Sequence, residues 1–208
     1  MRLIFLLLPS LALIQAKPTY WNQFRGPNGD GDAQNSQLPV QFSETKNLTW
    51  KTSITGKSWS SPVVKDGKVW ITNAEEDGYK MWAIQLDWKT GKQIKKILVF
   101  ENKDPQFCHP MNSYATPTPV IDGNMVFVHF GSHGTAALDA KSGIKIWERR
   151  DFKCDHYRGA AASPITHLQN LIIHFDGHDL QYIVCMDQKT GRTIWKKERE
   201  YDFKTDNG

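Results

Sequence analysis

After residue 17 the sequence lacks any segment of useful length whose apolar residues recur with a helical period. This absence excludes helical and α/β folds for the body of the chain. The sequence also lacks a strong charge imbalance, since 26 Lys and Arg against 22 Asp and Glu leave a net charge of +4, spread along the chain. A balance this weak does not indicate a nucleic-acid partner.

Two catalytic or metal-binding motifs are incomplete. Ser132 in Gly-Ser-His-Gly lacks the Gly two residues before it that a nucleophile elbow needs. The acidic run Asn28-Gly-Asp30-Gly-Asp32 lacks a Glu at the twelfth loop position, so it is not an EF-hand. We therefore predict no catalytic residue and no metal site from these motifs.

The only long apolar run lies at the start of the chain. Arg2 precedes an apolar stretch over 3–14, and Ile14-Gln-Ala16 is a plausible cleavage site, so residues 1–16 are predicted to be a signal peptide. A retained membrane anchor is the less favoured alternative, because the stretch is short for a bilayer span. No Cys follows it, so lipid attachment is not indicated. We expect a periplasmic or extracellular chain without a membrane span after signal removal.

One phrase occurs three times: Asp87-Trp-Lys-Thr-Gly91, Asp139-Ala-Lys-Ser-Gly143 and Asp187-Gln-Lys-Thr-Gly191. Its Asp positions lie 52 and 48 residues apart, a spacing typical of repeat proteins. In this phrase Asp can accept hydrogen bonds from backbone amides two residues on, and Gly supplies the positive φ of a tight turn.

Each repeat also begins with a Ser/Thr-Pro step, and β-rich runs follow it. The steps are Ser61-Pro62, Thr118-Pro119 and Ser163-Pro164. Asp66-Gly67 and Asp122-Gly123 then give strong hairpin signals in the first two repeats, whereas 168–170 is a weaker turn in the third. Four short strands per unit of about 45 to 50 residues indicate an all-β fold made of β-propeller blades.

The repeats set the expected domain organisation. An N-terminal extension over 17–46 and a strand over 47–54 precede three propeller repeats within 55–208, at about 58–104, 113–153 and 160–203.

The pattern A-x-D-x-x-T-G-x-x-x-W resembles the tryptophan-docking repeat of pyrroloquinoline-quinone (PQQ)-type β-propellers. The strings 21–27 (WNQFRGP), 109–119 (HPMNSYATPTP) and 130–134 (FGSHG) are similar to those of secreted PQQ-binding-like β-propeller repeat proteins. The resemblance implies docking roles for Trp147 and Trp195. That superfamily contains quinoprotein dehydrogenases and non-enzymatic outer-membrane assembly lipoproteins.

Rings of this superfamily have seven or eight blades, whereas about three are present here. The resemblance therefore implies an N-terminal fragment, in which the strand over 47–54 would complete a missing last blade. Association of three blades with copies of themselves is the less favoured alternative.

The first repeat departs from the pattern at two positions. The Trp position is Lys95, against Trp147 and Trp195 in the later repeats, and the small-residue position is Gln85, against Ala137 and Cys185. The first repeat is thus degenerate, and its docking contact cannot be predicted. Cys185 is expected to be a buried thiol in a strand.

Two cysteines share a position in the linkers between repeats. Cys108 and Cys154 lie 11 and 10 residues before the repeated Pro, so a disulfide between them is the favoured pairing in an oxidising compartment. Two free thiols are nearly as well supported, because a Cα separation cannot be read from a sequence. A zinc site that adds His109 and His156 ranks lower, since the spacing matches no zinc motif.

Four polar residues of these linkers are candidate ligand-binding residues at the mouth of the central channel: His109, Asn112, His156 and Arg158. They could hold an acidic or sugar-like ligand. The alternative, that they fix loop geometry by hydrogen bonds, is somewhat favoured. His129 and His174 share one repeat position, which favours a structural role for both.

Two functions follow from the resemblance. The first is a non-enzymatic binding or scaffold module with a protein or glycan partner. The alternative is a PQQ- and calcium-dependent dehydrogenase whose catalytic half is absent from this chain. The dehydrogenases use adjacent cysteines and calcium-binding carboxylates, and this sequence has no Cys-Cys pair and no acidic cluster in the linkers. No cofactor is evident, and PQQ with calcium enters by resemblance only.

Overall fold

The computed structural model describes residues 20–33 and 38–199, and over this part the chain forms three four-stranded antiparallel sheets. The first sheet holds β1 (Val63–Lys65), β2 (Lys68–Ala74), β3 (Lys80–Asp87) and β4 (Gln93–Glu101). The second holds β5 (Val120–Asp122), β6 (Met125–His129), β7 (Thr135–Asp139) and β8 (Lys145–Arg149). The third holds β9 (Ile165–His167), β10 (Asn170–Asp176), β11 (Gln181–Asp187) and β12 (Thr193–Glu198).

The predicted all-β class is confirmed, and each sheet has the four consecutive strands of a propeller blade. Among the described residues the single helical element is the 3-10 turn η1 (Gly131–His133). No helix in 20–33 or 38–199 is long and apolar enough to cross a membrane. The predicted signal peptide, residues 1–16, lies outside the described residues.

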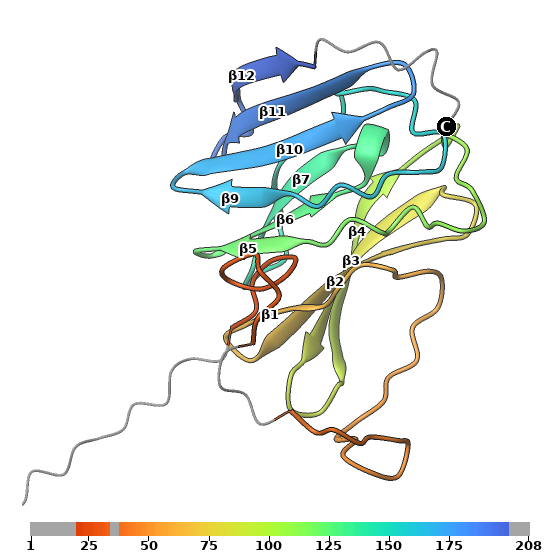
Figure 1. The fold of residues 1–208 in the computed structure, drawn as a ribbon, viewed down its shortest axis with the longest axis vertical. Coiled ribbons are helices and arrows are strands. Elements are labelled where there is room, and N and C mark those ends of the chain that lie inside the picture. The colour runs from red at the N-terminus through yellow and green to blue at the C-terminus, as the bar shows by residue number, and fades with distance from the viewer. Residues whose placement is uncertain (1–19, 34–37, 200–208) are drawn as a thin grey trace, which may run out of the picture.

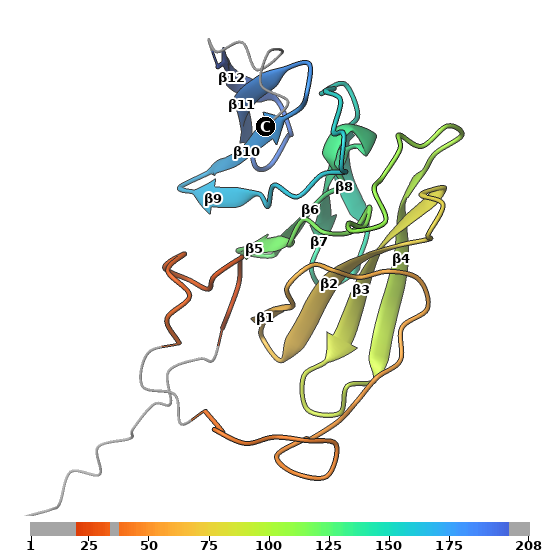
Figure 2. The ribbon, with the colours of Figure 1, turned by 45° about the vertical axis from the view of Figure 1, so that its right-hand side comes forward.

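The three blades stand side by side in chain order (Figure 1, Figure 2). One apolar cluster packs blade one against blade two, around Trp70, Phe100 and Phe130. A second packs blade two against blade three, around Phe127 and Phe175. Successive side chains of a strand point to opposite faces of its sheet, so a blade between two others can have two apolar faces. Each interface between blades is therefore a hydrophobic core.

The repeated phrase forms the turn between the third and fourth strand of each blade. Asp87 Oδ1 accepts hydrogen bonds from the Lys89 and Thr90 amides, at 3.1 and 3.0 Å, and from the Thr90 hydroxyl at 2.9 Å. The Thr90 hydroxyl and amide hold the pKa of the Asp87 carboxyl below its usual value. Gly91 closes the turn with φ +69°, where a side chain would be strained.

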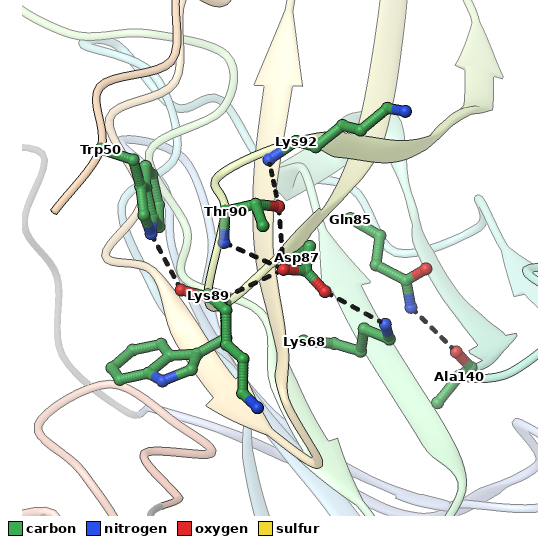
Figure 3. Close-up of polar contacts among 9 residues, drawn as sticks. Trp50, Lys68, Gln85, Asp87, Lys89, Thr90, Lys92 and Ala140 are labelled. Carbon is green, nitrogen blue, oxygen red and sulfur yellow. Dashed lines mark hydrogen bonds and ion pairs between the residues drawn. The ribbon is translucent and has the colours of Figure 1, made fainter.

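Each such turn receives a side chain from the preceding segment. The Trp147 indole on β8 lies against Gly191, and its Nε1 donates to the Gln188 carbonyl at 2.7 Å. Trp50 repeats this contact on blade one, where it lies against Gly91 and its Nε1 donates to the Trp88 carbonyl at 2.9 Å (Figure 3). We call this arrangement the docking contact.

Blade one keeps the docking contact without a tryptophan. The Gln85 Nε2 donates to the Ala140 carbonyl at 3.1 Å, and this carbonyl has the same repeat position as those of Trp88 and Gln188 (Figure 3). The side chains of Lys95 and Ile97 pack over Gly143 in place of the indole. Three residues thus make the contacts that one Trp makes in blade two.

The structure shows no strand over 47–54, although the sequence predicted one there. A strand needs a ladder partner, and no strand in the described part of the chain pairs with this segment. Its residues Trp50 and Ile54 instead cover the outer face of blade one together with Trp21. Trp195, at the same repeat position as Trp147, is 43% exposed because no turn of the described residues lies beside it.

The Ser/Thr-Pro steps join neighbouring blades at their innermost strands. The Ser61 amide donates to Thr118 Oγ1 at 3.0 Å, and the Thr118 amide donates to Ser163 Oγ at 3.0 Å. Each hydroxyl therefore satisfies a backbone donor of the preceding blade. Proline is tolerated at each step because it stands directly before the first residue of the innermost strand, where the ladder needs no amide.

The loop formed by residues 20–33 pairs with two of these inner strands. Trp21 exchanges two backbone hydrogen bonds with Val64, both at 2.8 Å. Asn22 accepts one from the Ile121 amide at 2.8 Å and returns one from its side chain at 3.0 Å. The loop, red in Figure 1, thereby ties blade one to blade two.

His129 is a polar residue within the second core. It is fully buried, its Nδ1 lies 2.8 Å from Thr135 Oγ1, and its ring packs edge-on against Phe175. Its Nε2 has no hydrogen-bond partner in the described residues. Burial lowers its pKa from 6.5 to about 3. His129 is therefore neutral in the folded protein at neutral pH.

We expect Thr118→Val to lower the free energy of unfolding by about 1 to 2 kcal/mol, because the Ser61 amide loses its acceptor while the shape of the side chain is kept. Ser61→Ala is the matched control, because the Ser61 hydroxyl forms no hydrogen bond among the described residues, and it should cost less than about 0.5 kcal/mol. Urea unfolding of both variants checks this. Equal losses would contradict the role of the hydroxyl.

His129 should make the protein less stable in acid. The pKa of His129 in the folded protein lies below its unfolded value. Its contribution to the free energy of unfolding is therefore complete above about pH 6.5 and is lost as the pH falls towards 3. From pH 7 to pH 5 the loss is about 2 kcal/mol. His129→Gln should remove this part of the pH dependence of urea unfolding. Parallel pH profiles for the variant and the natural protein would contradict it.

Candidate functional site

The candidate site residues lie in the linkers between blades, 102–119 and 150–164, at the strand ends opposite the docking turns. Two of the four predicted residues are brought together. The Asn112 side chain donates to the Arg158 carbonyl at 2.9 Å. Its oxygen accepts from the Ser113 amide at 2.8 Å and from the Thr116 hydroxyl at 2.5 Å. The Asn112 side-chain nitrogen thus joins the two linkers, while its oxygen holds the fold of its own linker.

The side chains of the other two predicted residues make separate contacts, although the His109 carbonyl accepts from the Asn112 amide at 2.8 Å. His109 is half-buried, its Nδ1 accepts from the Met111 amide at 3.1 Å, and its ring packs edge-on against Phe107. His156 is 8% exposed, stacks on Phe175, and has a pKa lowered by burial.

Cys154 and His156 form a buried pair. The Cys154 Sγ lies 3.2 Å from His156 Nε2, while the Ser132 hydroxyl donates to the Cys154 carbonyl at 2.6 Å and accepts from its amide at 3.0 Å. Burial raises the pKa of the Cys154 thiol to about 11. Because the thiolate is the reactive form, this cysteine is held as an inert thiol at neutral pH.

The favoured disulfide between Cys108 and Cys154 is not formed, and all three cysteines are free. The Cys154 sulfur faces His156 in the core, whereas the Cys108 sulfur faces the linker backbone. It lies 3.9 Å from the Arg158 carbonyl and against Gly159, where an added Cβ would come within 2.7 Å of it. The two cysteines share a repeat position, but their sulfur atoms point in different directions. Cys185 is buried, as expected for a strand thiol.

Sequence reasoning missed the part that Gln106 takes in this region. Its amide donates to His133 Nε2 at 3.1 Å, its side chain donates to the Cys154 carbonyl at 3.0 Å, and its carbonyl accepts from the Tyr114 hydroxyl at 2.7 Å. Burial lowers the pKa of His133 to about 4, which leaves Nε2 free to accept. No repeated motif marks Gln106, so no signal in the sequence pointed to it.

The linkers expose both charged and apolar side chains. Among the apolar ones, Phe107 is 64% exposed, Met111 81% and Tyr157 63%, and the exposed charged ones include Asp104, Asp155 and Arg158. A separate cleft of about 700 Å³ is lined by other residues, among them Phe24, Trp59, His156 and His174. Within 20–33 and 38–199, no three His, Cys, Asp or Glu side chains lie close enough to hold a metal ion.

Three solved structures of similar fold are dehydrogenases by their titles. The first is a europium-containing methanol dehydrogenase, with 15% identity and a TM-score of 0.54 over 74% of this chain and 27% of that chain. The second is the quinohemoprotein alcohol dehydrogenase ADHIIG from Pseudomonas putida HK5, with 21% identity and a TM-score of 0.52 over 72% of this chain and 22% of that chain. The third is the quinohemoprotein alcohol dehydrogenase from Comamonas testosteroni, with 19% identity and a TM-score of 0.51 over 69% of this chain and 21% of that chain. At these identities the likeness shows the fold. The chain spans about a quarter of their length. No curated protein matches the sequence.

A family model gives a more specific match. The model described as "Outer membrane protein assembly factor BamB" covers residues 36–207, which include all three blades. The turns, docking contacts and four-stranded blades described above are what a PQQ-type propeller repeat requires. The chain therefore belongs to this family of PQQ-like β-propeller proteins.

Proposed function

We propose that this chain is a non-enzymatic binding module of an exported propeller, and that it binds a protein partner through its linker face. We define the linker face by Phe107, Met111, Tyr157 and the exposed Arg158. The observation that carries the proposal is the division of labour in the linkers. The side chains of Asn112 and Gln106 bond to neighbouring backbone, whereas Phe107, Met111 and Tyr157 are exposed together with charged side chains such as Arg158.

This division is typical of an interface for another protein. Aromatic residues, Met and Arg are enriched in such interfaces, and exposed aromatic anchors supply much of their binding energy. Ordering of the linkers by Asn112 and Gln106 would lower the entropy cost of binding. The name of the matching family, an outer-membrane assembly factor, also supports a protein partner.

The described residues do not fit PQQ with calcium. Calcium needs six to eight oxygen ligands, and no group of three acidic, His or Cys side chains is close enough for a metal in this part of the chain. The linker cysteines Cys108 and Cys154 are neither adjacent nor ionised by their surroundings, since burial raises both pKa values. No step of a quinone reaction is assigned to these residues.

We expect that the full-length protein, mixed with PQQ and calcium and passed through gel filtration, retains no quinone absorbance. A PQQ dehydrogenase apoprotein treated in the same way serves as the positive control. Stoichiometric retention of the quinone with the protein would contradict the binding-module proposal and support the dehydrogenase.

The linker face should also contact its partner in cells. A photo-crosslinking amino acid placed at Met111 of the full-length protein should give a discrete adduct with one partner. The same amino acid at Lys189, which is exposed in the docking turn of blade three, is the matched control and should give none. Identical patterns at both positions, or no adduct at Met111, would contradict the linker face as the binding surface.

A further inference from the structure

The two departures of blade one face each other across its third and fourth strands. Gln85 on β3 pairs with Lys95 on β4. The same register pairs Ala137 with Trp147 in blade two, and Cys185 with Trp195 in blade three. At this pair of positions blade one therefore has an amide side chain in place of a small residue, and an ammonium group in place of an indole.

A cleft opens between blades one and two where the indole would lie. Its volume is about 320 Å³, and it is found at the docking-turn end of the blades, opposite the linker face. Gln85 forms part of its lining and is 2% exposed, and its side-chain nitrogen donates to the Ala140 carbonyl.

Four lysines line the cleft against a single acid. They are Lys65, Lys68, Lys95 and Lys141, and the acid is Asp66. The formal charge of the lining is thus four positive against one negative. A concave surface lined by charges of one sign raises the local concentration of the opposite ion.

Nearby contacts neutralise these lysines only in part. The Lys65 ammonium donates to the Gly123 carbonyl at 2.8 Å, and that of Lys68 lies 3.8 Å from Asp87 (Figure 3). Lys141 helps to lower the pKa of Asp139, whose carboxylate is already bound by Ser142. No ion pair of the Lys95 ammonium is found in the described part of the chain.

Trp70 and Ile121 form the floor of the cleft, but at 1% and 2% exposure they offer almost no surface to a ligand. Ile94 is the apolar side chain of the lining that a ligand can reach, since it is 42% exposed. The volume exceeds what a bare oxyanion would fill, and in the neighbouring interface part of the equivalent space holds the indole of Trp147. The site therefore combines a reachable apolar side chain with a cationic rim.

From these features we propose that the cleft binds an oxyanion, such as a phosphate, sulfate or carboxylate, carried on a flat ring. The ring takes the part of the indole space that the Lys95 and Ile97 side chains leave open, beside Ile94. The oxyanion meets the ammonium groups of Lys95 and Lys141 at the rim. The charge-assisted hydrogen bonds of these lysines would supply the specificity for an anion.

Calorimetric titration of the full chain at low salt tests this with phenyl phosphate, inorganic phosphate and phenol. Phenyl phosphate should bind saturably and more tightly than inorganic phosphate, and phenol should not bind. Saturable binding of phenol, equal binding of the two phosphates, or no binding of phenyl phosphate would overturn the proposal.

Lys141→Gln should weaken phenyl phosphate binding at least about fivefold, because it removes one charge-assisted contact. Lys189→Gln is the matched control, since Lys189 has the same repeat position in blade three and lies outside the cleft. It should bind like the natural protein. Equal effects of the two variants would show non-specific charge attraction and overturn the site.

A second variant restores the repeat. Gln85→Ala combined with Lys95→Trp should fill the cleft with an indole and abolish phenyl phosphate binding, with the unfolding midpoint retained or raised. Undiminished binding by this folded double variant would overturn the proposal. If the double variant does not fold, the comparison of Lys141→Gln with Lys189→Gln decides.

Discussion

The docking contact, in which a side chain of one blade donates to a turn carbonyl of the next, is the interaction on which this fold depends. The turn must be rigid before it can receive a partner, and the Asp87, Asp139 and Asp187 carboxylates make it so by binding amides of their own turns. Glycine at the end of the phrase then leaves room for an indole directly against the backbone. Because each contact joins two blades, stability is passed from neighbour to neighbour along the array, as in other repeat proteins.

The inner ends of the blades use a different device for the same purpose. There the Ser/Thr hydroxyls accept amides of the preceding blade, and the linkers are joined by Asn112 and Gln106. The polar side chains of Asn112 and Gln106 are therefore used by the architecture. The linkers leave exposed aromatic, Met and charged side chains for function, and a binding role fits this mixture better than acid-base chemistry. Neutral buried His133 and the protonated Cys154 agree with that division.

The turns and the blade architecture could be predicted from the sequence because they depend on residues close together in the chain. Asp and Gly at fixed spacing determine a turn wherever they occur, and Trp147 repeats at a fixed distance from it. The Gln85 contact could not be predicted, since its partner Ala140 lies 55 residues away and only the folded blades bring them together. The disulfide failed for a related reason: Cys108 and Cys154 share a repeat position, but their side-chain directions depend on local backbone such as Gly159. Asn112 was placed correctly in a linker, whereas Gln106 carried no repeated signal.

Repetition also explains how blade one can lack the tryptophan and still contact blade two. In blade one, Gln85 makes the carbonyl contact, and Ile97 and the stem of Lys95 pack over Gly143. Trp70 stands where blade two has the smaller Phe127. Three partial substitutes do not reproduce one rigid indole, so space remains between the blades. A solvent-accessible gap within an otherwise dry interface costs packing energy. Its lysine-rich lining makes sense physically if the gap is filled by an anion when the protein works, because the ligand then supplies both the missing contacts and the missing negative charge.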